Sequence, residues 1–176
     1  EDTKPDILFL DSCKLYPDGT KKSIGYHIDP GSINRKSKSE VLCYLSGLPK
    51  FPDSACMKIY RRAFLFNCGL RFPEDGRVSE DLNFVMNSLL DAETYSALDL
   101  NYYEYRQNRA GSITDAVGLK HFQGLQQFIE DAIPVLCDSD YRPKNNDCAC
   151  CLSFVAYEYS IMLLSLIHIS EPTRRS

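Results

Sequence analysis

Two adjacent carboxylates, Glu80 and Asp81, are the residues of this sequence best placed to do chemistry. They follow Ser79, a residue type that caps helices by accepting a hydrogen bond from a backbone N–H two or three residues further on. A carboxylate at a helix N-terminus is held ionised by the helix dipole and suits the removal of a proton from a reacting group. The pair also has a simpler explanation, because acids in a first turn stabilise a helix by about 0.3–1 kcal/mol each.

The element that must position this pair is an amphipathic helix. Leu82, Val85, Met86 and Leu89 recur at helical spacing and predict one buried stripe directly after the two acids. The helix therefore has to pack against a core, and the remaining segments must supply that core.

Composition narrows the classes of protein. The 176 residues suffice for one domain, and 44% hydrophobic with 25% charged residues is ordinary globular usage. A net charge of −4 without a Lys/Arg block argues against a nucleic-acid partner, which needs a basic face. We expect no transmembrane helix, because we find no run of roughly 18 apolar residues. Residues 1–6 lack both an initiator Met and a signal-peptide pattern, so we expect a chain entered partway through.

The eight cysteines do not form a recognisable metal or disulfide pattern. Cys13, Cys43, Cys56 and Cys68 lie in apolar stretches, where a free thiol behaves as a small buried hydrophobe. The cluster at Cys148–Cys151 lacks the paired spacing of zinc sites and has no nearby His. We expect a reduced, cytoplasmic protein.

In residues 1–115, predicted strands and helices alternate, as in an α/β domain. The sequence predicts a hairpin from a strand at 6–16 and a second arm at 20–24, with a loop at 29–32. A capping box at Ser37–Glu40 opens a helix that ends at Gly47, and a second helix is predicted over Ala55–Leu65. Residues 95–105 are predicted to form one or two strands, followed by a polar loop at 106–114.

Residues 116–163 are predicted to form a helical extension. Apolar residues at helical spacing occur over 119–129 and again over 152–161, and a polar linker at 138–147 separates them. Residues 164–176 are expected to be an artefact, because Leu164–Arg174 reads as the translation of a transposon-end sequencing adapter.

Five short motifs occur in a specific order along residues 6–115, which gives the chain a family resemblance. It resembles the C-terminal half of the bacterial family 2 glycosyltransferases, which have the nucleotide-sugar-transferase (GT-A, Rossmann-like) α/β fold and build surface polysaccharides. The motifs are Lys58–Arg62, Gly69–Pro73, Ser79–Phe84, Tyr102–Arg106 and Gly111–Thr114.

The resemblance implies roles for the acidic pair and for two residues ahead of it. Asp81 matches the family's catalytic base, which takes the proton of the acceptor hydroxyl as that oxygen attacks the sugar. Glu80 is expected to have an orienting role, because neighbouring helix residues diverge. Lys58 and Tyr60 are candidates to line the acceptor side, with a purely structural role as the alternative.

Two further residues are donor-side candidates by the same resemblance. Arg106 suits the donor diphosphate or an acidic neighbour, since its planar guanidinium fits either, and an ordinary surface ion pair is the alternative. Ser112 lies in a loop that could order over the donor.

One part of the family pattern is missing from the sequence. The metal-binding Asp-x-Asp motif should lie upstream of the acidic pair, but Asp11–Cys13 has Cys in place of the second acid, and Asp138–Asp140 comes too late. We therefore expect that this fragment binds no metal and is inactive alone, while the full-length enzyme needs Mg²⁺ or Mn²⁺. The expected partners of that enzyme are a nucleotide-sugar donor and a saccharide or lipid-linked acceptor, in the cytoplasm or at the inner face of the membrane.

Two other functional classes compete with this interpretation. In a non-catalytic α/β interaction domain, Glu80 and Asp81 would only stabilise the start of the helix. Nuclease or phosphatase chemistry is disfavoured, because His27 and His121 lie away from any acidic cluster in the sequence.

Overall fold

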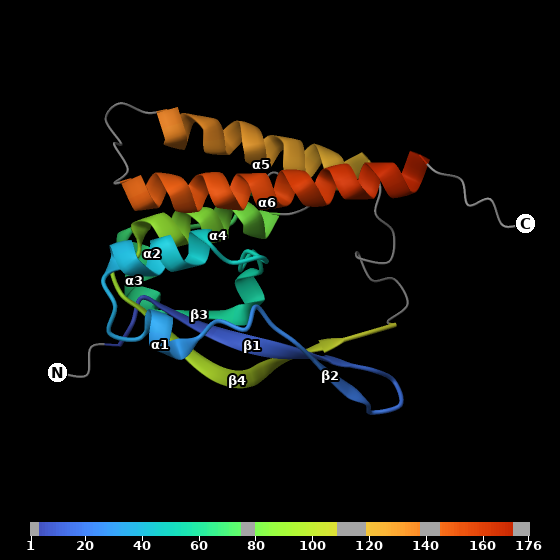
Figure 1. The fold of residues 1–176 in the computed structure, drawn as a ribbon, viewed down its shortest axis with the longest axis horizontal. Coiled ribbons are helices and arrows are strands. Elements are labelled where there is room, and N and C mark those ends of the chain that lie inside the picture. The colour runs from blue at the N-terminus through green and yellow to red at the C-terminus, as the bar shows by residue number, and fades with distance from the viewer. Residues whose placement is uncertain (1–3, 75–79, 109–118, 138–144, 171–176) are drawn as a thin grey trace, which may run out of the picture.

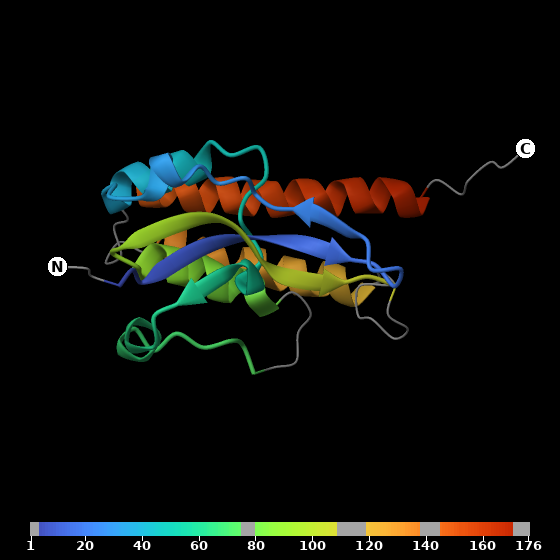
Figure 2. The same ribbon diagram turned by 90° about the horizontal axis from the view of Figure 1, so that it is seen from below.

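The computed structural model describes residues 4–74, 80–108, 119–137 and 145–170. These residues form a mixed α/β structure, as the sequence predicts. A sheet lies on one side, helices α2 and α4 lie over it, and the long helices α5 and α6 form the outermost layer (Figure 1). The two views of the ribbon agree on this order (Figure 2).

The sheet is organised around one strand, β1 (Ile7–Leu15). The hairpin strand β2 (Lys21–Ile24) pairs antiparallel with the second half of β1, and β3 (Lys58–Tyr60) pairs antiparallel with its first half. The strand β4 (Tyr95–Arg106) runs parallel to β1 along its length, with register shifts between Phe9 and Ser12. The predicted hairpin is confirmed, and residues 95–106 form a single strand.

Two predicted segments differ from the observed ones. Residues 29–32, predicted as a loop, contain the short helix α1 (Pro30–Ile33), because the Asp29 side chain accepts a hydrogen bond from the Gly31 N–H and caps it. The single helix predicted over Ala55–Leu65 is wrong. That segment forms a 3-10 turn, η1 (Ala55–Met57), then β3, then α3 (Arg62–Asn67), because pairing with β1 overrides helical spacing.

The helices that matter most for the site follow their sequence signals. The capping box at Ser37 and Glu40 is present, and α2 spans Lys38–Ser46. The helix α4 (Glu80–Asp91) begins at the acidic pair, while Ser79 lies outside the described residues. Leu82, Val85, Met86 and Leu89 are all buried, so the predicted stripe is confirmed.

The predicted helical extension forms α5 (Leu119–Cys137) and α6 (Asn145–Ser170). Residues 145–147 of the predicted linker belong to α6, and the rest of that linker lies outside the described residues. The backbone of α6 remains helical to Ser170, within the segment that resembles a sequencing adapter. The adapter origin of that segment stays a prediction.

The helix α6 shares its core with the α/β part. Phe154 stacks on Phe51 with ring centroids 4.3 Å apart and also packs on Phe128 of α5 at 5.1 Å. The Ser153 hydroxyl donates to the Ser46 carbonyl at the end of α2 (2.9 Å). All three rings are buried, so α5 and α6 extend one continuous core.

By length and composition, α6 is also apolar enough to cross a membrane. The window Asp147–Leu164 has a mean hydropathy of 1.4, and 28% of it is buried. The composition of α6 therefore does not support the expectation that the chain has no membrane-spanning helix. The core helix of a globular protein passes the same test, and α6 packs on α2 and α5 here.

The cysteines of the described residues are free thiols with contrasting environments. Cys13, Cys150 and Cys151 are buried. The expectation of burial holds for Cys13 but is wrong for Cys43 on α2, Cys56 on η1 and Cys68 at the end of α3, which are exposed.

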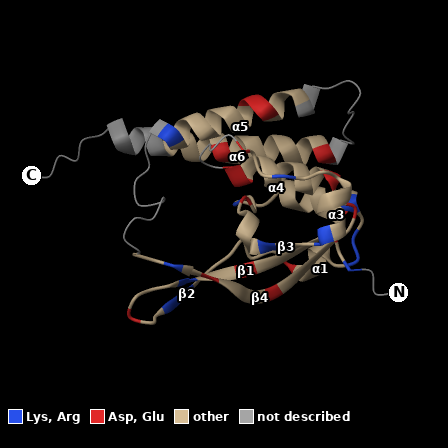
Figure 3. Ribbon diagram, turned by 180° about the vertical axis from the view of Figure 1, so that it is seen from behind, with Lys and Arg blue, Asp and Glu red and all other residues tan. Residues whose placement is uncertain are grey.

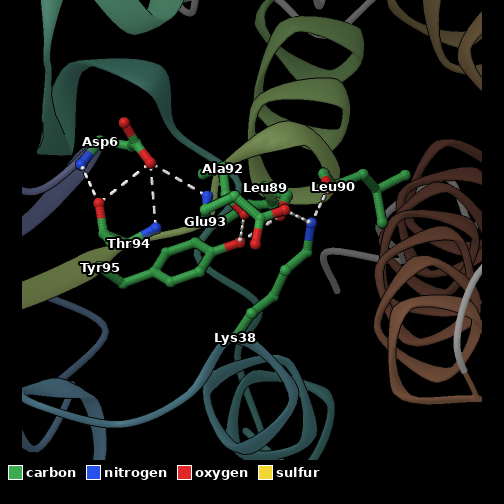
Figure 4. Close-up of polar contacts among 8 residues, drawn as sticks. All are labelled: Asp6, Lys38, Leu89, Leu90, Ala92, Glu93, Thr94 and Tyr95. Carbon is green, nitrogen blue, oxygen red and sulfur yellow. Dashed lines mark hydrogen bonds and ion pairs between the residues drawn. The ribbon is translucent and has the colours of Figure 1, made fainter.

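A buried carboxylate, Asp6, joins the start of β1 to the connection between α4 and β4 (Figure 4). One oxygen of Asp6 accepts the backbone N–H groups of Glu93 and Thr94 and the Thr94 hydroxyl, each at 3.0 Å. The other oxygen is held by the guanidinium of Arg61, which lies between β3 and α3. Burial alone would raise the pKa of Asp6, but these hydrogen bonds together outweigh it and lower the pKa.

The C-terminal end of α4 is fixed by two more side chains in the same region (Figure 4). The buried Tyr95 hydroxyl lies 2.6 Å from the Leu89 carbonyl and 2.9 Å from the Ala92 carbonyl. The Lys38 ammonium donates to the Leu90 carbonyl and to Glu93. These contacts satisfy carbonyl groups that a helix end leaves unpaired.

We predict that Asp6→Asn lowers the free energy of unfolding by about 2–4 kcal/mol, because it removes the buried partner of Arg61 and leaves N–H groups poorly paired. Since the folded-state pKa of Asp6 is lowered, its stabilisation is present above the ordinary value of 3.8 and is lost as the pH falls through the folded-state pKa. Urea unfolding of both proteins over a pH series measures this difference. The exposed Asp99→Asn serves as the control, and an equal effect of both substitutions would contradict the assignment.

Candidate functional site

The acidic pair at the start of α4 splits in two directions, as helix geometry predicts. The Glu80 side chain is exposed, whereas Asp81 is half-buried and turns toward η1. The Asp81 carboxylate accepts a long hydrogen bond of 3.4 Å from the Ala55 backbone N–H. Asp81 is therefore the member of the pair that faces the interior of the site.

The pKa of Asp81 is raised above its ordinary value. Burial is the largest cause, and the charges of Glu80 and Asp53 act in the same direction. The Ala55 N–H and the Lys58 ammonium oppose the shift and only partly offset it. The expectation that the helix dipole alone keeps this carboxylate readily ionised is thus too simple, because its burial makes Asp81 more basic.

The cation that opposes this shift, Lys58, is itself buried. Its ammonium donates to the Pro52 carbonyl (2.8 Å) and to the Ser54 carbonyl (2.7 Å). Burial lowers the pKa of Lys58 to about 8, against the opposing effects of Asp53 and Asp81. The structure thus gives Lys58 the structural contacts that were the alternative to substrate binding, and its role on the acceptor side stays a prediction.

Two acids that the sequence did not single out complete this polar cluster. Asp53 accepts a hydrogen bond from the Tyr26 hydroxyl, and Tyr26 in turn accepts one from the Ser54 N–H (2.8 Å). Glu158 of α6 is 6% exposed, and burial, together with a hydrogen bond to Asp53, raises its pKa to about 8. One signal was available, because Glu158 lies four residues after the core residue Phe154 and so shares its helix face.

Three of the sequence motifs meet at one aromatic cluster beside Asp81. Phe72 stacks on Phe84 with centroids 4.2 Å apart, and Tyr60 packs edge-on against Phe84 at 5.1 Å. The Tyr60 hydroxyl is buried, which raises its pKa, and the charge of Asp81 adds to that shift. Tyr60 therefore lies near Asp81, and its role on the acceptor side stays a prediction.

Among the described residues, no contact joins Asp81 to the donor-side candidate Arg106. Arg106 is exposed at the end of β4, where its backbone pairs with Leu15 of β1. Lys21 and Lys22 of β2 lie at the same end of the sheet, where Figure 3 shows acidic positions beside the basic ones, and Lys21 forms an ion pair with Glu104. Ser112 lies outside the described residues.

The described residues do not fit a divalent metal ion. In those parts of the chain, no group of three or more His, Cys, Asp or Glu side chains is placed to hold one. Asp11 lies in the middle of β1, which continues to Leu15. Its carboxylate lies over Gly25, where any Cβ would clash at 2.2 Å, and 3.9 Å from the ring of His27.

The sheet and its covering helices form a mixed α/β structure that matches a Rossmann-like glycosyltransferase fold. Two crystal structures of S. aureus TarS, a glycosyltransferase, share it. For TarS 1-349 in complex with UDP-GlcNAc, the TM-score is 0.55 at 17% identity, over 96% of this chain and 45% of TarS 1-349. For TarS 1-349 alone, the TM-score is 0.50 at 16% identity, over 96% and 43%.

The chain therefore spans less than half the length of these structural neighbours. No family model and no curated protein sequence matches it. At this identity the likeness concerns the fold alone.

We predict that Lys58→Met lowers the free energy of unfolding by about 1–3 kcal/mol, because the Pro52 and Ser54 carbonyls lose their buried donor. It should also raise the pKa of Asp81 further, since the opposing cation is gone. Urea unfolding and an NMR titration of the Asp81 carboxyl test the two effects. The exposed Lys22→Met on β2 is the control, and an Asp81 pKa unmoved by Lys58→Met would contradict the proposed coupling.

Proposed function

We propose that this chain is the acceptor-side and base-carrying portion of an inverting glycosyltransferase that uses a nucleotide sugar. The observation that carries the proposal is the half-buried, basic Asp81 at a helix start within a fold shared with TarS, which binds UDP-GlcNAc. The motif order around Asp81 supports family 2, and hexosyl transfer to a saccharide or lipid-linked acceptor in surface polysaccharide synthesis.

In the proposed reaction, Asp81 acts as the general base. Its carboxylate accepts the proton of an acceptor hydroxyl while that oxygen forms a bond to the anomeric carbon of the sugar. The bond from that carbon to the nucleoside diphosphate breaks with its electron pair, so the configuration inverts. Burial makes Asp81 a stronger base, and Lys58 limits how far its pKa rises.

The other parts of the proposal concern residues and partners around this step. Glu80, exposed beside the base, is proposed to orient it or the acceptor, and Lys58 and Tyr60 to shape the acceptor side. Arg106 and Ser112 are proposed to contact the donor. Mg²⁺ or Mn²⁺ is proposed for the full-length enzyme, held by residues outside this chain, because the described residues do not fit it. We place that enzyme in the cytoplasm or at the inner face of the membrane.

An exposed apolar strip on the sheet supports the view that a further part of the enzyme covers it. Leu98, Leu100 and Tyr102 alternate along β4 and are 50%, 50% and 64% exposed. The three side chains lie close together in the sequence, in the part of β4 where its register against β1 shifts. A surface of this kind is normally covered by another element or partner, and the chain spans less than half of TarS 1-349.

We predict that Asp81→Asn in the full-length enzyme lowers kcat for sugar transfer by about 10²–10⁴-fold, because the amide cannot accept the proton. Donor affinity should change little, since the base acts on the acceptor. Transfer from UDP-GlcNAc and other nucleotide sugars, followed by release of the nucleoside diphosphate, provides the assay.

The matched control is Asp91→Asn at the other end of α4, which should keep wild-type turnover. Unchanged turnover in Asp81→Asn would remove the base role. Unchanged turnover together with a complete absence of nucleotide-sugar binding by the full-length protein would favour the interaction-domain alternative instead.

We also predict that this chain alone binds UDP-GlcNAc at least 100-fold more weakly than the full-length enzyme, with or without Mn²⁺, because nucleotide contacts and metal ligands are proposed to lie outside it. Isothermal titration of both proteins measures this ratio. Tight, Mn²⁺-dependent binding by this chain would show that the donor site is already complete.

A further inference from the structure

Glu158 is a buried acid that the proposed sugar transfer does not use. It projects from the middle of α6, the element that adds to the α/β part, and only 6% of it is exposed. Its buried Oε1 atom has no hydrogen-bond partner among the described residues, and the neighbouring acid is Asp53. A buried carboxyl group beside a second carboxylate, with no cation bonded to it among those residues, favours its neutral form, so we infer that the Asp53–Glu158 pair holds one proton.

The charged groups around Glu158 come from several elements. Asp53 lies in the segment before η1 and Asp81 at the start of α4, while Tyr157 is its neighbour on α6. Lys58 of β3 is the cation next to Asp53 and Asp81. With the shared proton in place, the Lys58 cation balances one of the two remaining carboxylates. Loss of that proton would add a second uncompensated negative charge to a buried cluster, which is strongly unfavourable.

Hydrogen bonds and the chain itself connect Asp53 to the region of Asp81. Asp53 binds the Tyr26 hydroxyl, and Tyr26 binds the Ser54 N–H. The next residue, Ala55, donates its N–H to Asp81. Segment 52–55 is therefore linked to Glu158 through Asp53 and to Asp81 through Ala55.

We propose that Glu158 is a positioning residue of the Asp81 site, and that the proton it shares with Asp53 seats α6 on segment 52–55 and limits the negative charge next to Asp81. The part of this inference that concerns Asp81 in sugar transfer rests on the proposed function. The part that concerns the seating of α6 does not.

The sign of the pH dependence follows from the direction of the Glu158 shift. Its folded-state pKa of about 8 lies above the ordinary value of 4.5. The stabilisation is therefore complete below the ordinary pKa and is lost as the pH rises toward about 8. Over that window, one extra proton held by the folded state raises the unfolding equilibrium constant by up to tenfold per pH unit.

The first experiment uses this chain and the variant Glu158→Gln, whose amide resembles the protonated acid and can still donate to Asp53. Urea unfolding over a pH series gives the slope of the unfolding free energy against pH, which counts the protons lost on unfolding. Glu158→Gln should lower that count by about one, whereas the exposed Glu130→Gln should leave it unchanged. An identical slope in the wild type and in Glu158→Gln overturns the inference. If Glu158→Gln fails to fold, Asp53→Asn provides the same comparison, because it replaces the other half of the pair.

The second experiment uses the full-length enzyme. In the wild type, kcat/KM for transfer should fall as the pH rises above about 8, and Glu158→Gln should retain at least tenfold more activity there while matching the wild type at lower pH. If the pH profiles of the wild type and Glu158→Gln superimpose while their unfolding slopes differ, the link to Asp81 is overturned but the seating of α6 is not. A full-length protein without any transfer activity refutes the proposed function, and the unfolding slope then still decides the seating of α6.

Discussion

The carboxylate of Asp6 is the constraint on which the arrangement of this molecule depends. It lies at the start of the strand that pairs with all three others, and it binds the segment that joins α4 to β4 as well as the guanidinium of Arg61. One buried charge thus sets the spacing between the sheet and the C-terminal end of α4. Its low folded-state pKa follows from that arrangement, because donors from two segments, Arg61 and the α4–β4 connection, converge on it.

The N-terminal end of α4 is held in a different way, and the difference suits a reactive residue. Asp81 has a single long hydrogen bond from Ala55 and a buried cation, Lys58, in its neighbourhood. A carboxylate saturated with donors, as Asp6 is, would be a poor base, because its pKa is lowered. The same helix therefore carries a firmly bonded end at the sheet and an end at which a carboxylate keeps its basicity.

Sequence reasoning succeeded where the signal is local and failed where pairing decides. The capping box at Ser37 and the apolar stripe of α4 predicted their helices correctly, because both depend on neighbouring residues. Segment 55–65 was predicted wrongly, since its strand exists only through contact with Ile7–Phe9. The same limit explains why Asp53 was missed, because its partners Tyr26 and Glu158 are distant in the sequence.

The position of Glu158 also changes how α5 and α6 should be regarded. By its apolar composition alone, α6 resembles an appended or membrane-crossing helix. A membrane-crossing helix with an ionisable residue at its centre would need a partner for that residue inside the bilayer. Here the partner is Asp53 of the α/β part, and Phe154, one turn earlier on α6, stacks on Phe51 from the same segment of the chain. The contact between Phe154 and Phe51 holds α6 against the α/β part. Glu158 of α6 is next to Asp53 and Asp81, so α6 forms one side of the candidate site.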